Sequence, residues 1–263
     1  MRNLLFFDID GTLITEDERH LFPADAKAAL EAARHAGNLI FINTGRTRFN
    51  VEQILAEAEF DGVVCGCGTY IEYHGEVLHH HMLSRERCYE LAQICRECRM
   101  QAIFEYSDFC GYDAELDLPF LAPMIQEMKD FGFTVQTDIT APDFRFDKFA
   151  GWFDETGDVE RFRREIEKDF VYIHRGEGFF EVEPIGYSKA SGMQFLLDYF
   201  QLPTDAAYAF GDSNNDLEML QFAAHAVSMA RGSEACRKAA HFVTTDVEEG
   251  GIRIALEHFG LLG

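Results

Sequence analysis

The chain has 263 residues, which is enough for one large domain or for two smaller domains with cores of their own. Its hydrophobic content of 47%, with 25 phenylalanines, is typical of a globular protein and excludes a disordered chain. The formal net charge of −23 argues against DNA or RNA as a partner, because phosphate neutralisation dominates that affinity, although a single phosphate group can still be held locally.

The sequence also predicts a cytoplasmic location. No stretch reaches the roughly eighteen uninterrupted apolar residues of a membrane span, so we expect no membrane partner. The N-terminus lacks the basic segment, apolar core and cleavage site of a signal peptide. The seven cysteines are odd in number and show no paired framework, which indicates free thiols in a reducing compartment. Nothing in the sequence indicates the oligomeric state.

The first predicted element is a buried strand that ends in two carboxylates. Residues 4–13 read LLFFDIDGTL, and such an apolar run suits a strand buried on both faces. On an extended backbone Asp8 and Asp10 point to the same side, at the strand end where open α/β sheets place their ligands. Two crowded carboxylates repel each other unless a cation neutralises them, which indicates a metal site. The alternative is a simple Asp-Gly turn that ends the strand.

Strand and helix signals then alternate as far as residue 82. The predicted elements are a helix opened by Pro23 and closed by Gly37, a strand at 38–43, a helix from Thr47 to about Ala58, a strand at 62–65, and a hairpin of 69–73 and 76–82 around the turn His74-Gly75. This alternation predicts parallel pairing with right-handed crossovers.

A different pattern covers the middle of the chain. Helices are predicted at 84–99, 119–131 and 158–168, and short strands at 101–106, 110–114, 148–153, 170–175 and 179–183. Helices mixed with pairs of short strands are typical of an α+β unit on an antiparallel sheet.

After Ser188 the alternation returns. The predicted elements are a helix at 189–200, a strand at 206–210, a short helix from Asn215, a strand at 224–229, a helix at 233–240, a strand at 242–244 and a final helix. We therefore predict an α/β fold with a doubly wound parallel sheet built from residues 1–82 and 186–263, with an α+β domain inserted at 83–185.

Polar side chains gather where the parallel strands end. The strand at 206–210 runs into Gly211-Asp-Ser-Asn-Asn-Asp216, a second acidic loop, and the strand at 38–43 runs into Thr44-Gly45-Arg46. Lys189 opens a helix directly after the inserted segment. Acids, a hydroxyl and a lysine are what phosphoryl transfer needs, because a cation and a lysine neutralise developing charge while one carboxylate attacks.

These motifs identify a family resemblance that covers the whole chain. Asp8-Ile-Asp-Gly-Thr12, Asn43-Thr-Gly-Arg46, Lys189 and Gly211-Asp-Ser-Asn-Asn-Asp216 occur in the order seen in haloacid dehalogenase-like hydrolases. The chain resembles in particular the Cof-type phosphatases, which have a Rossmann-like core and an inserted type IIB (C2B) α/β cap that covers the site and sets specificity. The resemblance implies a phosphoric monoester hydrolase.

The resemblance also implies a role for each motif residue. Asp8 is expected to be the nucleophile and Asp10 the general acid and base. Mg²⁺ is expected on the Asp8 carboxylate, the Asp10 backbone carbonyl and Asp212, with Asp216 behind them. Thr44 and Lys189 complete the catalytic set. The expected phosphate contacts are Gly11, Thr12, Gly45, Arg46 and Asn215.

Several residues keep a second interpretation. Lys189 could be an ordinary solvated residue at a helix start, and Arg46 could form a surface ion pair instead of reaching substrate. Cys95 and Cys98 could bind zinc, but we favour free thiols because no spacing brings four ligands together.

Two loops depart from the pattern of the family. Cys67-Gly-Thr stands where relatives often have Asn-Gly-Ala, and Ala-Arg231-Gly stands where they often have Gly-Asn-Ala. Neither change removes a member of the catalytic set. We hypothesise that Arg231 contacts an anionic substrate.

We therefore predict a Mg²⁺-dependent phosphatase that acts on a small phosphorylated metabolite, such as a sugar phosphate, through an aspartyl-phosphate. The alternatives are a phosphomutase or phosphotransferase of the same superfamily and a non-catalytic metabolite-binding protein. The sequence leaves the identity of the metabolite open.

Overall fold

The computed structural model describes residues 2–116, 121–130 and 132–263, and these divide into two compact units. Unit 1 comprises the chain up to Arg46, residues 50–80 and residues 187–263, and unit 2 comprises residues 47–49 and 81–186. The assignment of the units to catalysis and to substrate selection stays a prediction. None of the described helices is long and apolar enough to cross a membrane.

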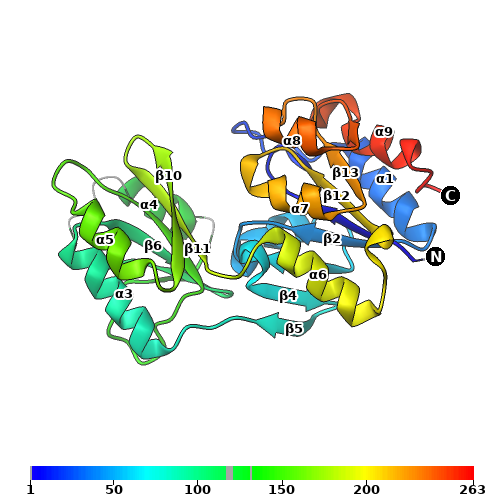
Figure 1. Cartoon of the computed structure of the whole chain (residues 1–263). Helices are drawn as coiled ribbons and strands as arrows, with labels where there is room; N and C mark the ends of the chain where they lie inside the picture. The colour runs from blue at the N-terminus through cyan, green and yellow to red at the C-terminus, as the bar shows by residue number, and fades with distance from the viewer. Residues whose placement is uncertain (1, 117–120, 131) are drawn as a thin grey trace. The chain divides into compact units, whose positions relative to one another are not determined.

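Unit 1 is built on an eight-stranded sheet (Figure 1). In spatial order its strands are β14 (Phe242–Val243), β13 (His225–Ser228), β12 (Ala207–Gly211), β1 (Leu4–Phe7), β2 (Leu39–Asn43), β3 (Gly62–Cys65), β4 (Tyr70–Tyr73) and β5 (Glu76–His80). The pairs from β14 to β3 are parallel, and β4 and β5 extend the sheet antiparallel. The parallel α/β fold predicted for this part of the chain is confirmed.

Helices cover both faces of this sheet because β1 is apolar on both sides. Leu5 and Phe7 face a core with helices α1 and α9, while Leu4 and Phe6 face a core with α6 and α7. The helices of unit 1 are α1 (Ala24–His35), α2 (Glu52–Leu55), α6 (Lys189–Phe200), α7 (Leu217–Phe222), α8 (Glu234–Ala239) and α9 (Gly251–His258). Its 3₁₀ turns are Arg48–Val51, which spans the unit boundary, Gly66–Gly68, Thr204–Ala206, Asn214–Asp216 and Val247–Glu249.

One helix predicted for this part of the chain is wrong in its length and type. The helix expected from Thr47 to Ala58 is a 3₁₀ turn at Arg48–Val51 followed by a single turn, α2. The hairpin turn is confirmed, since His74 and Gly75 have φ values of 47° and 81°, as a tight turn between antiparallel strands requires.

In its described residues, unit 2 contains a six-stranded sheet with three helices. In spatial order the strands are β10 (Phe170–Gly176), β11 (Phe179–Pro184), β9 (Lys148–Trp152), β6 (Gln101–Glu105), β7 (Cys110–Gly111) and β8 (Val135–Gln136), and the helices are α3 (Arg85–Glu97), α4 (Ala122–Asp130) and α5 (Val159–Ile166). The prediction missed β8, which pairs parallel with β7 in an otherwise antiparallel sheet. Of the helix predicted at 119–131, residues 119, 120 and 131 lie outside the described part.

An aromatic core stabilises unit 2. Phe149 contacts the rings of Phe104, Phe162 and Phe180, with centroids 5.7, 6.2 and 6.3 Å away.

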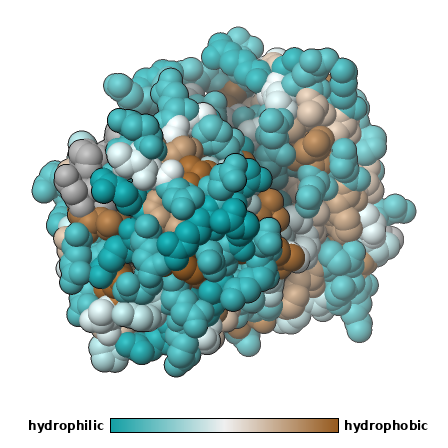
Figure 2. Space-filling view, turned by 60° about the vertical axis from the view of Figure 1, so that its left-hand side comes forward, coloured by the Kyte–Doolittle hydropathy of each residue, from teal (hydrophilic) through white to brown (hydrophobic). Residues whose placement is uncertain are grey.

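The face of the molecule shown in Figure 2 is mainly hydrophilic, with small hydrophobic areas between the polar side chains.

A substitution in β1 tests whether this strand holds unit 1 together. Phe7 is fully buried and stacks on Phe210 with ring centroids 4.2 Å apart. Phe7→Ala should lower the free energy of unfolding by about 3–5 kcal/mol, because it removes buried area and leaves a cavity. Tyr199→Ala, at a side chain 48% exposed, is the control and should cost less than half of that. Equal losses in urea unfolding followed by circular dichroism would contradict this assignment.

Candidate active site

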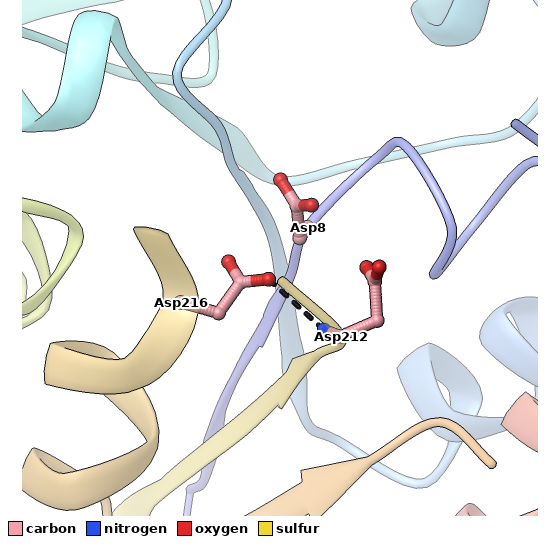
Figure 3. A group of neighbouring side chains, drawn as sticks. All are labelled: Asp8, Asp212 and Asp216. Atoms are coloured by element: carbon pink, nitrogen blue, oxygen red, sulfur yellow. Dashed lines mark hydrogen bonds between the residues drawn. The ribbon is translucent and has the colours of Figure 1, made fainter. Parts of the chain in front are cut away.

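Three aspartates meet at the carboxyl end of the parallel sheet in unit 1 (Figure 3). Asp8 follows β1 directly and Asp212 follows its neighbour β12. Asp216 ends the 3₁₀ turn Asn214–Asp216. One carboxylate oxygen from each of the three lies within 4.8 Å of the others, and all three residues are buried. We call Asp8, Asp212 and Asp216 the acidic trio.

The loop after β12 folds back on itself to place Asp216. The backbone N–H groups of Asp212 and Ser213 both donate to Asp216 Oδ2, each at 2.9 Å. A Cβ on Gly211 would lie 2.7 Å from the Asp216 Cβ, so only glycine leaves room for this fold. The sequence shows a glycine and acids in this loop, but it does not reveal the two hydrogen bonds to Asp216.

Lys189 is the counter-charge of the acidic trio. Its Nζ donates to Asp8 Oδ1 at 2.6 Å and to Asp216 Oδ1 at 2.5 Å, and its side chain has no solvent exposure. Ser188 caps helix α6, and the Asn43 amide donates to the Lys189 backbone oxygen at 3.0 Å. The interpretation of Lys189 as an ordinary solvated residue is therefore wrong, and Asn43 is a positioning residue that the sequence did not reveal.

The electrostatics of this cluster are unbalanced, because three buried carboxylates share one lysine. Burial, together with Asp216, raises the pKa of Asp8 from 3.8 to about 8. Burial and Asp216 likewise raise the pKa of Asp212 to about 7. Burial lowers the pKa of Lys189, but Asp216 and Asp8 outweigh it and the net shift is upward. A hard divalent cation is the charge that this oxygen donor set lacks.

Asp10 lies outside the acidic trio. Its carboxylate accepts from Arg46 Nε at 2.9 Å and from the Arg46 terminal nitrogen at 2.5 Å, and its side chain is 40% exposed. The expectation that Asp8 and Asp10 point to the same side assumed an extended backbone, but β1 ends at Phe7. Of the two interpretations of Arg46, the structure shows an ion pair.

Gly11 and Thr12 support Asp212. Gly11 has φ +76°, and a Cβ there would lie 2.5 Å from Asp212 Oδ2; its N–H donates to Ile14 O at 2.9 Å. The Thr12 hydroxyl donates to Asp212 Oδ1 at 2.9 Å and is completely buried. The Gly11 N–H and the Thr12 hydroxyl are thus engaged within the chain, and the phosphate contacts expected at Gly11 and Thr12 stay predictions.

The remaining motif residues gather around the turn after β2. Thr44 is buried, and its hydroxyl oxygen accepts from Arg46 N at 3.1 Å. A Cβ on Gly45 would lie 3.5 Å from Cys67 Sγ and 3.7 Å from Asn215 Nδ2, so these two side chains lie beside the turn. Ser213 Oγ donates to Asn215 Oδ1 at 2.5 Å, which directs the Asn215 amide nitrogen away from that oxygen. Cys67 has φ 54°, a left-handed conformation that asparagine adopts more readily.

A pocket of about 430 Å³ adjoins Asp212 within unit 1. Its lining includes Asp17, Arg231 and Asp246. Arg231 Nε contacts Asp246 Oδ2 at 2.7 Å, and the arginine side chain is 87% exposed. Arg231 therefore lines the same pocket as Asp212, while its contact with an anionic substrate stays a hypothesis.

The cysteines support the interpretation as thiols. All seven are buried thiols outside disulfide bonds, and burial raises the pKa of Cys95 well above its ordinary value. In the described part of the chain, the acidic trio is the group of side chains close enough together to hold a metal ion. Neither Cys95 nor Cys98 belongs to such a group.

Comparison with known proteins decides the family. A model of haloacid dehalogenase-like hydrolases matches residues 5–256. The chain belongs to this family. It is 27% identical to the YkrA protein of Bacillus subtilis (strain 168) over 98% of both chains. It is 23% identical to 5-amino-6-(5-phospho-D-ribitylamino)uracil phosphatase YwtE of the same organism over 93% of both chains.

A solved structure agrees with these relatives. The sugar phosphatase BT4131, of subclass IIB, has a TM-score of 0.78 and is 26% identical, covering 98% of this chain and 99% of that one. The predicted family, the fold class and the class of enzyme, a phosphoric monoester hydrolase, are therefore confirmed. Phosphatases of this family typically use a metal ion, which fits the donor set of the acidic trio.

The raised pKa values predict a pH-dependent response to metal. Because the pKa values of Asp8 and Asp212 rise from 3.8 to about 8 and about 7, their contribution to stability is present below about pH 4 and is lost as the pH rises through these values. A bound cation removes this penalty. Millimolar Mg²⁺ should therefore raise Tm by about 5–10 °C near pH 8.5, and by less than half as much near pH 5.5.

Two variants locate this response. Asp212→Asn should abolish the Mg²⁺-dependent rise in Tm, measured by differential scanning fluorimetry. Asp17→Asn, in the adjoining pocket but outside the acidic trio, should keep it. The opposite pattern would assign the cation to the pocket and contradict the prediction.

Proposed function

We propose that this protein is a Mg²⁺-dependent phosphatase that hydrolyses a small phosphomonoester through an aspartyl-phosphate on Asp8. The observation that carries this proposal is the buried lysine shared by Asp8 and Asp216. A carboxylate held in this way is fixed at the sheet edge where ligands of α/β folds bind. Membership of the hydrolase family supports the same chemistry.

The residues present fit a magnesium ion. The Asp8 carboxylate, Asp212 and the Asp10 backbone carbonyl would hold it, with Asp216 orienting Asp212 through the loop backbone. When bound, the ion would neutralise charge on the phosphoryl oxygens.

Asp8 would attack the phosphorus in the first half-reaction. A bond forms between an Asp8 oxygen and phosphorus as the bond from phosphorus to the ester oxygen breaks. Lys189 already contacts Asp8 at 2.6 Å, so its positive charge lies next to the transferring group without reorganisation. The Thr44 hydroxyl and the Asn215 amide are the proposed phosphate contacts, and Gly45 lies beside the Asn215 amide.

Asp10 would supply and recover the proton. It gives a proton to the departing ester oxygen and later takes one from the water that attacks the aspartyl-phosphate, which restores the Asp8 carboxylate. An exposed fraction of 40% at the Asp10 side chain is consistent with access to a leaving group and to water.

We propose that unit 2 selects the leaving group. Its sheet carries Lys148 and Glu105 with Nζ and Oε2 3.7 Å apart, and the rings of Trp152 and Phe179 with centroids 4.8 Å apart. Charged groups and aromatic rings together suit a polyhydroxylated organic group. The names of YwtE and BT4131 describe phosphates carried by a ribityl group and by sugars, which supports a small phosphorylated sugar or sugar alcohol.

A screen for phosphate release tests this proposal. Purified protein with Mg²⁺ should release phosphate from one or more members of a panel of phosphorylated metabolites, without added bisphosphate. Asp8→Asn should reduce the rate by at least about 1,000-fold, because it removes the nucleophile while keeping the side-chain volume. Asp17→Asn serves as the matched control and should keep most of the activity.

Two outcomes would contradict the proposal. Hydrolysis that persists in Asp8→Asn would exclude the aspartyl-phosphate. Turnover that appears only with a bisphosphate activator would indicate a phosphomutase.

A further inference from the structure

The ion pair between Arg46 and Asp10 has a geometry that a chance surface contact rarely has. Arg46 Nε donates to one Asp10 oxygen at 2.9 Å, and its terminal nitrogen donates to the other at 2.5 Å. Two parallel donors from a planar group fix both the position and the plane of a carboxylate. The Arg46 side chain is 24% exposed, so the pair is partly shielded from water.

Arg46 is itself fixed to the core of unit 1. Its other terminal nitrogen donates to Asn50 O at 3.3 Å, so each of its three guanidinium nitrogens donates to the chain. Its backbone N–H donates to the Thr44 hydroxyl at 3.1 Å, and its carbonyl accepts from Gly66 N at 2.8 Å. Three of the five guanidinium N–H groups of Arg46, one on each nitrogen, are therefore engaged within the chain, which fixes the orientation of the side chain.

We propose that Arg46 is a positioning residue that acts through Asp10, and not a phosphate ligand. The proposal rests on the proposed function, in which Asp10 passes a proton to the ester oxygen as the phosphorus–oxygen bond breaks. In the acid step Asp10 carries the proton on one oxygen, and the Arg46 N–H that donates to the other oxygen keeps the carboxyl group from rotating away from the leaving group. Once the proton has passed to the ester oxygen, both oxygens of the resulting carboxylate accept from Arg46, as in the structure. One short turn thus connects the phosphate contact Thr44 to the orientation of Asp10.

The dependence of the rate on the leaving group separates the two roles. A phenolate such as that of p-nitrophenyl phosphate leaves without much protonation, whereas the alkoxide of a sugar phosphate needs a well-placed acid. For Arg46→Ala we expect kcat/KM to fall about 100-fold on glucose 6-phosphate, or on the best alkyl ester of the screen, and less than about 10-fold on p-nitrophenyl phosphate. Millimolar guanidinium should restore part of the activity on the alkyl ester.

Two variants complete the experiment. Arg46→Lys should recover little, because an ammonium group cannot hold both carboxylate oxygens. Arg34→Ala is the matched control: Arg34 is also 24% exposed and pairs with Asp61, and its loss should not change the ratio between the two esters.

A double-mutant cycle with Asp10→Asn gives an independent readout. Combining Arg46→Ala with Asp10→Asn should add little to the loss caused by Asp10→Asn alone, since both changes remove the same oriented group. A merely structural Arg46 would instead lower Tm and add its loss to that of Asp10→Asn.

Equal losses on both esters, with no rescue by guanidinium, would overturn the proposal and make Arg46 a phosphate ligand. This failure is distinct from failure of the proposed function. In the first case the wild-type enzyme is active and Asp8→Asn is not; in the second, Asp8→Asn retains activity or wild-type protein hydrolyses no ester.

Discussion

The buried ammonium group of Lys189 is the interaction on which the site depends. It contacts Asp8 on one side and Asp216 on the other, and it has no access to water. A lysine in this position would be unstable without carboxylates beside it, because burial of an unpaired charge is costly. The same carboxylates, with Asp212, carry more negative charge than one lysine neutralises. The site is therefore organised around a deficit of positive charge, which a divalent cation can fill.

The fold brings these charges together through the order of the strands in the sheet and through local features of two loops. Parallel strands β1 and β12 are neighbours in the sheet, so their carboxyl ends place Asp8 and Asp212 side by side although 203 residues separate them in the sequence. The cap at Ser188 starts helix α6 so that Lys189 is its first residue. Gly211 leaves space for Asp216 to fold back. The last two arrangements each depend on a residue type with a specific local property: the capping hydroxyl of Ser188 and the missing side chain of Gly211.

The sequence correctly predicts the structural features that depend on hydrophobic patterning and on motifs. The apolar run before Asp8 predicts β1, and the alternation of strands and helices predicts the parallel sheet of unit 1. The order of the four motifs predicts the family. The strand and the sheet follow from periodicity and composition, whereas the family follows from the resemblance of the motifs; neither needs knowledge of side-chain contacts. The one-turn helix α2 does not follow, because the propensity of its residues for a longer helix yields to tertiary packing.

The sequence does not predict which polar groups pair. Asp10 and Arg46 are 36 positions apart, and the Thr12 hydroxyl and Asp212 are 200 positions apart, yet each pair forms a hydrogen bond. Such contacts depend on the path of the loops at the sheet edge, where no periodic signal exists. For this reason the sequence did not predict the hydrogen bonds of Thr12 to Asp212 and of Arg46 to Asp10, and the phosphate contacts expected from these residues stay predictions.

Crystals grown with Mn²⁺ in place of Mg²⁺ give the most direct test of the central charge deficit. We expect an anomalous peak at the carboxylates of Asp8 and Asp212, with Lys189 still in contact with Asp8 and Asp216. A peak confined to the neighbouring acidic pocket at Asp17 and Glu248, or no peak at the acidic trio, would contradict the account.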